Sequence, residues 1–197
     1  SDNMVGTAPD TRLAGQLVLS NASALSAYTY IRNVNFLLNN LGNCSEAGTK
    51  AYNQLVGEAY YFRAWYYFTM FRNYGPLAWV DRPLDPDMAQ MKLPRDSRTV
   101  VADHILADLD KAIELLGEQN SSASMRVHRD VARWLKSEVA LYEGTWEKYH
   151  KAEGDAFYDP AATDAKINDY LKQAADAAKA VSDRGVWQIS TDGGTLD

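Results

Sequence analysis

One segment of the chain holds nine aromatic residues within fifteen positions, between Tyr60 and Tyr74. Apolar residues in and before this segment recur at steps of three and four, which is the spacing of helix faces. One stripe is Leu55, Ala59, Phe62, Tyr66 and Met70, and a second is Val56, Tyr60, Ala64, Tyr67, Phe71 and Tyr74. A helix that is apolar on two faces must be covered on both, so we expect it to form the middle layer of a stack. Phe62 and Tyr67 should then be buried.

Four further segments carry helical spacing and end near glycine or proline. We expect helices at about 27–41, 50–74, 99–116, 128–149 and 164–184. Thr99 is a suitable N-cap for the third of them. Strand signals are confined to two short stretches, 77–80 and 186–189. The sequence therefore predicts an all-α fold, in a single helical domain over residues 1–197.

Small residues at the expected helix crossings favour stacked helical hairpins, an irregular tetratricopeptide-like α/α superhelix. The helices do not keep the strict 34-residue period of that repeat. A long insert at 82–94, rich in proline, separates the second helix from the third.

Composition excludes some functions. The formal net charge is −6 and the basic residues are scattered, so we expect no nucleic-acid partner, because phosphates need a basic face. A single cysteine, Cys44, allows no intrachain disulfide. No apolar run reaches the length of a membrane span.

Motifs for nucleotides, metals and activated nucleophiles are absent, so the sequence predicts no catalytic residue, no metal and no cofactor. Neither Glu143 with Glu147 nor Asp155 with Asp159 carries the signature of a glycosidase. We expect these four carboxylates to be solvated or to cap turns. None of the histidines is paired at metal-binding spacing, and we interpret all three as capping or surface residues. They are His104, His128 and His150.

Aromatic residues outside the packed segment are the candidates for ligand contact, because sugars stack on exposed aromatic planes. We name Tyr28, Trp146 and Tyr149 as candidate ligand-binding residues. Packing explains Trp146 and Tyr149 equally well.

Five blocks of the sequence carry a family resemblance. The most specific is EAYYFRAWYYF at 58–68, which closes on RNYGPL at 72–77. The other blocks are YTYIRNVN at 28–35, LPRDS at 93–97 with ILADLDKA at 105–112, RVHRDVARWLK at 126–136 with ALY at 140–142, and AADAAKAV at 174–181. In this order they resemble the SusD-like (RagB/SusD) nutrient-binding proteins.

The resemblance implies a function and a location. SusD-like proteins are bacterial outer-membrane lipoproteins that bind glycans or other nutrients at the cell surface, without catalysis. The implied partners are an oligo- or polysaccharide and a TonB-dependent SusC-like transporter. Relative to that family the chain lacks the lipidated N-terminus and the long C-terminal half, so we expect a fragment of a longer protein. Its only membrane attachment would be a lipid anchor that this chain does not contain.

Two other classes stay open from the sequence. A tetratricopeptide-type interaction module would bind a peptide in its groove, and regular 34-residue phasing would favour it. An all-helical glycosidase would also have helices rich in aromatic residues, and a carboxylate pair in one pocket would favour it.

Overall fold

The computed structural model describes residues 21–84, 92–119 and 126–187, together with 11, 13–16 and 18. Within these residues the chain forms five helices: α1 (Asn21–Leu41), α2 (Lys50–Tyr74), α3 (Arg98–Leu115), α4 (Arg129–Glu153) and α5 (Asp164–Ser182). The β pairing found there is one isolated antiparallel bridge, between Leu77 and Asp96. The all-α prediction is confirmed.

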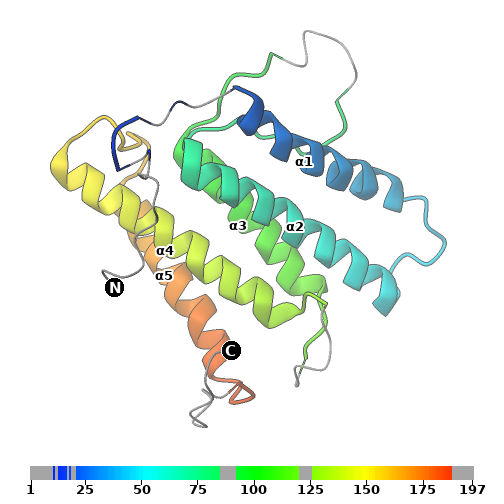
Figure 1. Cartoon of the computed structure of the whole chain (residues 1–197). Helices are drawn as coiled ribbons and strands as arrows, with labels where there is room; N and C mark the ends of the chain where they lie inside the picture. The colour runs from blue at the N-terminus through cyan, green and yellow to red at the C-terminus, as the bar shows by residue number, and fades with distance from the viewer. Residues whose placement is uncertain are drawn as a thin grey trace, which may run out of the picture.

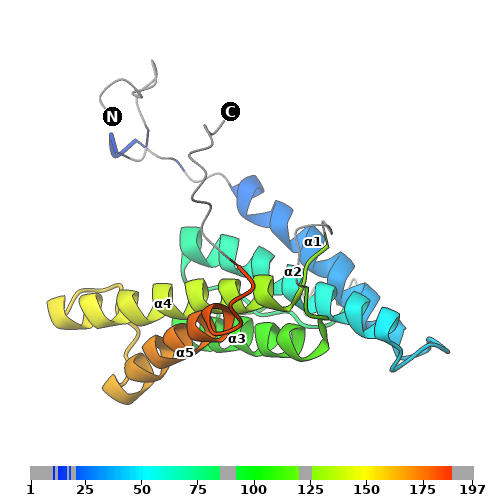
Figure 2. The same cartoon turned by 90° about the horizontal axis from the view of Figure 1, so that it is seen from below.

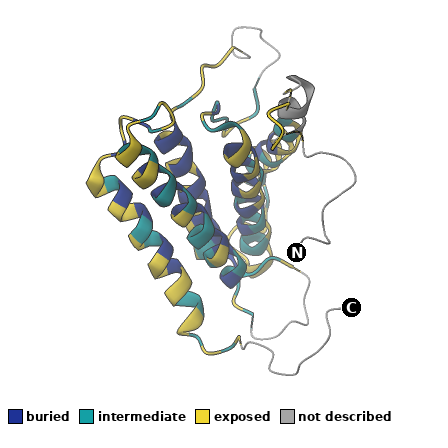
Figure 3. Ribbon diagram, turned by 60° about the vertical axis from the view of Figure 1, so that its left-hand side comes forward, coloured by how far each residue is buried: buried dark blue, intermediate teal, exposed yellow. Residues whose placement is uncertain are grey.

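Each helix packs against the next one along the chain, so α3 lies between α2 and α4. Consecutive helices run antiparallel (Figure 1), and the view from below shows the same order of neighbours (Figure 2). Buried residues line the sides on which helices face one another, and exposed residues cover the outer sides (Figure 3). The prediction of stacked helical hairpins is confirmed. Among the described helices, none combines the length and hydropathy needed to cross a membrane.

Helix α2 has the bounds that the sequence predicts. Thr49 caps its first turn by accepting the N–H of Tyr52 at 3.2 Å. The helix ends at Gly75, whose φ of 67° and ψ of −118° suit glycine alone. Gly75 donates its N–H to the carbonyl of Phe71 at 2.9 Å, which completes the last turn.

The two apolar stripes of α2 are not equally buried. Tyr67 and Phe71 are fully enclosed, whereas Phe62 is 41% exposed and Leu55 is 39% exposed. The prediction that both stripes are covered along their length is therefore wrong at Phe62 and Leu55. Helix α2 packs against α1, α3 and a small part of α4. These neighbours leave open the side that carries Phe62.

Several helix ends differ from the prediction. Helix α1 begins at Asn21 rather than near residue 27, and α4 continues to Glu153 rather than stopping near 149. Helix α3 begins at Arg98 with Ser97 at its N-cap, so Thr99 is a helical residue and not the cap. Helix ends are the least certain part of a sequence prediction, because neighbouring segments supply hydrogen bonds that local patterns do not encode.

In the stretch 77–80 that follows α2, only Leu77 takes part in a β bridge. Val80 donates its N–H to the hydroxyl oxygen of Tyr67 at 2.7 Å. That hydroxyl lies 3.3 Å from the Val80 carbonyl, to which it can donate. The stretch is thereby fixed to α2. Residues 85–91 of the insert and 188–189 of the second extended candidate lie outside the described residues.

A buried ion pair joins the first three helices. Arg63 of α2 donates from Nε and Nη2 to the two carboxylate oxygens of Asp108 on α3, at 2.6 and 2.7 Å. Its Nη1 donates to Oδ1 of Asn35 on α1 at 2.9 Å. All three side chains are buried. Because loss of either charge would leave its partner buried and uncompensated, we expect this pair to specify how the three helices align.

Replacing Tyr67 with alanine should lower the free energy of unfolding by about 3–5 kcal/mol, because it empties a fully buried site. It also removes the acceptor of the Val80 N–H. Phe62→Ala is the matched control on the same helix and should cost about 1 kcal/mol or less, because Phe62 already contacts solvent. Denaturant titration of both variants measures the difference. Equal losses for the two would contradict this assignment of the buried face.

Candidate functional site

A pocket of about 420 Å³ opens where the end of α2, the start of α3 and the loop between α4 and α5 meet. Its lining comprises residues 72–76, Ser97, Arg98, Trp146 and residues 156–160. Phe157 is 63% exposed at this pocket, whereas Trp146 is half-buried and donates from its indole nitrogen to the Phe157 carbonyl at 3.2 Å. The pocket therefore presents aromatic surface around one buried cation, Arg98.

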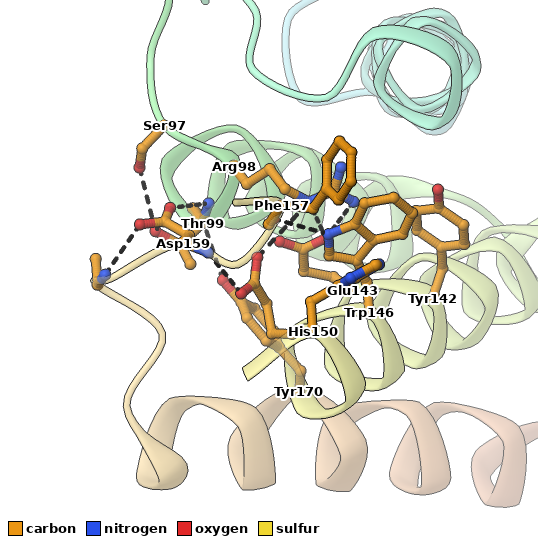
Figure 4. A network of polar contacts seen from close by, with 12 residues as sticks. Ser97, Arg98, Thr99, Tyr142, Glu143, Trp146, His150, Phe157, Asp159 and Tyr170 are labelled. Atoms are coloured by element: carbon orange, nitrogen blue, oxygen red, sulfur yellow. Dashed lines mark hydrogen bonds and ion pairs between the residues drawn. The ribbon is translucent and has the colours of Figure 1, made fainter. Parts of the chain in front are cut away.

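Arg98 contacts two aromatic rings and two carboxylates, of which Figure 4 shows Trp146 and Glu143. Its guanidinium carbon is 4.3 Å from the ring centroid of Phe71 on α2 and 4.1 Å from that of Trp146 on α4. Such cation–π contacts are strongest when water is excluded. Nη2 and Nε donate to Oε2 of Glu143 at 2.8 and 3.2 Å. Nε also lies 3.6 Å from Oε1 of Glu147.

Glu143 and Glu147 are fully buried, so the expectation that they are solvated or cap turns is wrong. They lie one turn apart on α4, on the side that faces α3 and Arg98. A sequence signal for this exists, because Leu135, Val139, Glu143 and Glu147 follow one another at steps of four. The two carboxylates therefore extend an apolar stripe.

Asp159 fastens the α4–α5 loop to the start of α3. Its Oδ2 accepts the backbone N–H of Thr99 at 3.0 Å and the Thr99 hydroxyl at 2.9 Å. Ser97, at the N-cap position, makes no capping hydrogen bond with its side chain, so Asp159 caps α3 from a distant part of the chain. The Asp159 N–H donates to Oε2 of Glu147 at 2.9 Å. Burial opposes ionisation of Asp159, but hydrogen bonds from Thr99 and Ala161 lower its pKa overall.

The carboxylates outnumber the cation in this network. Burial raises the pKa of Glu143 to about 8, although Arg98 opposes the rise. Burial also raises the pKa of Glu147. Oε1 of each glutamate has no hydrogen-bond donor among the described residues. The raised pKa values favour one proton on the pair, which would supply that donor and leave one negative charge to pair with Arg98.

The shared proton makes stability depend on pH. The pKa of Glu143 is higher in the folded protein than its ordinary value of 4.5. As pH rises from about 5 to about 8, the unfolded chain therefore releases a proton that the folded protein keeps, and the free energy of unfolding falls. Glu143→Gln stays neutral and retains a donor for Glu147. Between pH 5 and pH 8 the free energy of unfolding of Glu143→Gln should therefore fall by roughly 2–4 kcal/mol less than that of the parent protein.

Denaturant titrations at pH 5, 6.5 and 8 measure this effect, and the variant should be more stable than the parent protein near pH 8. The matched control is Glu138→Gln, a change on the same helix at a side chain that is 37% exposed. It should leave the pH profile unchanged. An unaltered slope in Glu143→Gln would show that Glu143 is ionised in the folded protein.

The structure separates the three residues that the sequence nominates for ligand contact. Only Trp146 lines the pocket. Tyr149, one turn further along α4, is 62% exposed. Tyr28 packs edge-on against Tyr67 and donates its hydroxyl to the Ala78 carbonyl at 2.9 Å, away from the pocket lining. Sequence reasoning missed Arg98, whose position depends on contacts between distant segments. Phe157 was among the aromatic residues outside the packed segment but was not selected as a candidate.

The three histidines occupy different places. His128 is the N-cap residue of α4, and its ring stacks on Trp187 with centroids 5.4 Å apart. His104 is exposed on α3 and stacks on Trp79 at 4.7 Å. His150 is in the last turn of α4, where its ring lies 4.2 Å from that of Trp146.

Comparison with known proteins identifies the family. A SusD-like family model, described as "Starch-binding associating with outer membrane", matches residues 20–141, which is more than half of the chain. The chain belongs to the SusD-like family. No curated protein matches it.

Solved structures share the fold. A SusD-like protein from Bacteroides fragilis is 28% identical and aligns over 70% of this chain and 28% of its own, with a TM-score of 0.58. A laminarin-binding SusD-like protein is 22% identical over 81% of this chain and 29% of its own, with a TM-score of 0.62. A structure with xylogluco-oligosaccharide is 21% identical over 92% of this chain and 34% of its own, with a TM-score of 0.67. The chain thus spans about a third or less of the length of these proteins.

Proposed function

We propose that this chain is the helical part of a protein that binds oligo- or polysaccharide at the surface of a bacterial outer membrane, without catalysis. A lipid anchor would hold the intact protein there, and a TonB-dependent SusC-like transporter would receive the glycan. The observation that carries the proposal is the match of residues 20–141 to the SusD-like family, together with the five stacked helices.

The pocket supports a binding role. Trp146 and Phe157 border it, and Tyr149 is exposed on the next turn of α4. Aromatic faces pack against the C–H faces of sugars, and a volume of about 420 Å³ is within the usual range of small-molecule sites. We therefore propose Trp146, Phe157 and Tyr149 as glycan-contacting residues. The candidacy of Tyr28 stays a prediction, and its hydroxyl is already engaged by Ala78.

The buried carboxylates support a role without catalysis. A glycosidase needs two carboxyl groups that flank the scissile bond of a bound sugar. Glu143 and Glu147 are adjacent on one helix, fully buried, and bound to Arg98 and the backbone of Asp159. Neither can reach a polysaccharide without breaking the network that holds the α4–α5 loop.

Calorimetric titration with starch, laminarin and xylogluco-oligosaccharide tests glycan binding, in the intact protein and in this chain. Phe157→Ala should weaken binding about tenfold, equivalent to about 1.4 kcal/mol, because it removes an exposed ring from the pocket. Its backbone hydrogen bonds remain possible. Trp134→Ala is the control, since Trp134 is an aromatic residue of α4 that is 52% exposed and does not line the pocket.

Loss of affinity in Trp134→Ala but not in Phe157→Ala would place the glycan elsewhere on the helices. Release of reducing sugar from any of these glycans would contradict the non-catalytic role. Binding by the intact protein but not by this chain would mean that the remainder of the protein supplies the site.

The partnership with a transporter needs a separate test. The intact protein should co-purify in detergent with a co-expressed SusC-like transporter from the same organism. A version without residues 20–141 should lose this association if the helices form the contact. Retention of the complex by the shortened protein would assign the contact to another part of the protein.

A further inference from the structure

Three side chains with metal-binding atoms meet where α4 ends. His150 and Glu153 belong to the last turn of α4, and Asp155 follows the helix. Between them Gly154 adopts the left-handed conformation, with φ of 65° and ψ of 29°, and donates its N–H to the His150 carbonyl at 2.9 Å. This reversal brings Asp155 back over the helix. One ligand atom from each side chain lies within 4.8 Å of the other two.

Two of the three side chains are held in place by their surroundings. Oδ2 of Asp155 lies 2.5 Å from Nδ1 of His150, and Oδ1 accepts the N–H of Phe157 at 2.8 Å. The His150 ring contacts two aromatic rings, with centroids 4.2 Å away in Trp146 and 5.6 Å away in Phe157 (Figure 4). Metal sites depend on such supporting contacts, because they orient the ligands before the ion arrives.

The position of the Glu153 and Asp155 carboxylates favours binding of a cation. Glu153 and Asp155 lie at the C-terminal end of α4, where the helix dipole disfavours negative charge. The lysine nearest to them in sequence is Lys151, and its Nζ pairs instead with Oδ1 of Asp164 at 2.7 Å. Across the part of the chain that the structure describes, neither Glu153 nor Asp155 pairs with a lysine or an arginine. A bound metal ion would supply positive charge to Glu153, and to Asp155, whose ion-pair partner among the described residues is His150.

We propose that His150, Glu153 and Asp155 bind one divalent transition-metal ion, and that zinc fits this ligand set best. Zinc takes nitrogen and carboxylate ligands at 2.0–2.2 Å, so its ligand atoms are about 3.3–3.6 Å apart. The ligand atoms of these three side chains lie within 4.8 Å of one another, a range that includes this spacing. Calcium prefers six or more oxygen ligands and rarely accepts an imidazole. The site goes beyond the proposed glycan binding, and sequence spacing did not indicate it because only one of the ligands is a histidine.

Calorimetric titration of the tag-free chain with Zn²⁺ tests the proposal. We expect one ion per chain and a rise in the melting temperature at saturating Zn²⁺, because a ligand of the folded state stabilises it. Glu153→Gln and His150→Gln should each weaken Zn²⁺ binding at least tenfold. Ca²⁺ at equal concentration should give no signal. The matched control is His104→Gln, which removes an exposed histidine from α3 and should leave the affinity unchanged.

Glu153→Gln is the cleaner variant, because Glu153 is exposed and its replacement should not disturb the fold, which circular dichroism can verify. Wild-type affinity in both site variants would overturn the proposal. An equal loss in His104→Gln would also overturn it, as would binding only at millimolar Zn²⁺. Each readout uses the metal alone, so failure of glycan binding would not affect the result.

Discussion

The guanidinium of Arg98 is the contact on which the arrangement of α2, α3 and α4 depends. Arg98 starts α3, lies between Phe71 of α2 and Trp146 of α4, and pairs with the one negative charge of the buried Glu143 and Glu147. A carboxylate buried without such a partner would cost several kcal/mol, so loss of this one cation would affect every segment around it. Through Glu147 the same network reaches the α4–α5 loop, which forms one wall of the pocket. The network around Arg98 thus stabilises both the packing of the helices and the wall of the pocket.

The features that the sequence predicted correctly are those set by residues close together in the chain. Helix α2 has its predicted ends because Thr49 and Gly75 are a capping residue and a terminating glycine, and both act within one turn. The exposure of Phe62 could not be predicted, because periodicity assigns a residue to a helix face without saying what covers that face. Glu143 was misjudged for a related reason. Its partner Arg98 is 45 positions away, and no local pattern links them.

The candidate sites are concentrated on the least regular part of the structure. The helices are a frame made of paired neighbours, whereas the loop after α4 carries Asp155, Phe157 and Asp159. Repeat proteins commonly combine stable stacked helices with loops that determine the ligand. Membership of the SusD-like family agrees with this division, because the family model matches residues 20–141, which hold most of the helical frame.

The capping of α3 by Asp159 sets an order for folding on the ribosome. The N–H of Thr99 has as its capping acceptor Asp159, which is 60 positions further along the chain and is therefore synthesised later. At about 5–20 residues per second, translation delivers that acceptor roughly 3–12 s after Thr99 itself. During this interval the first turn of α3 has its N–H groups open to water or to other chains. The N-terminal hairpin can therefore assemble early, but the junction between α3 and α4 is completed only when the loop after α4 has emerged.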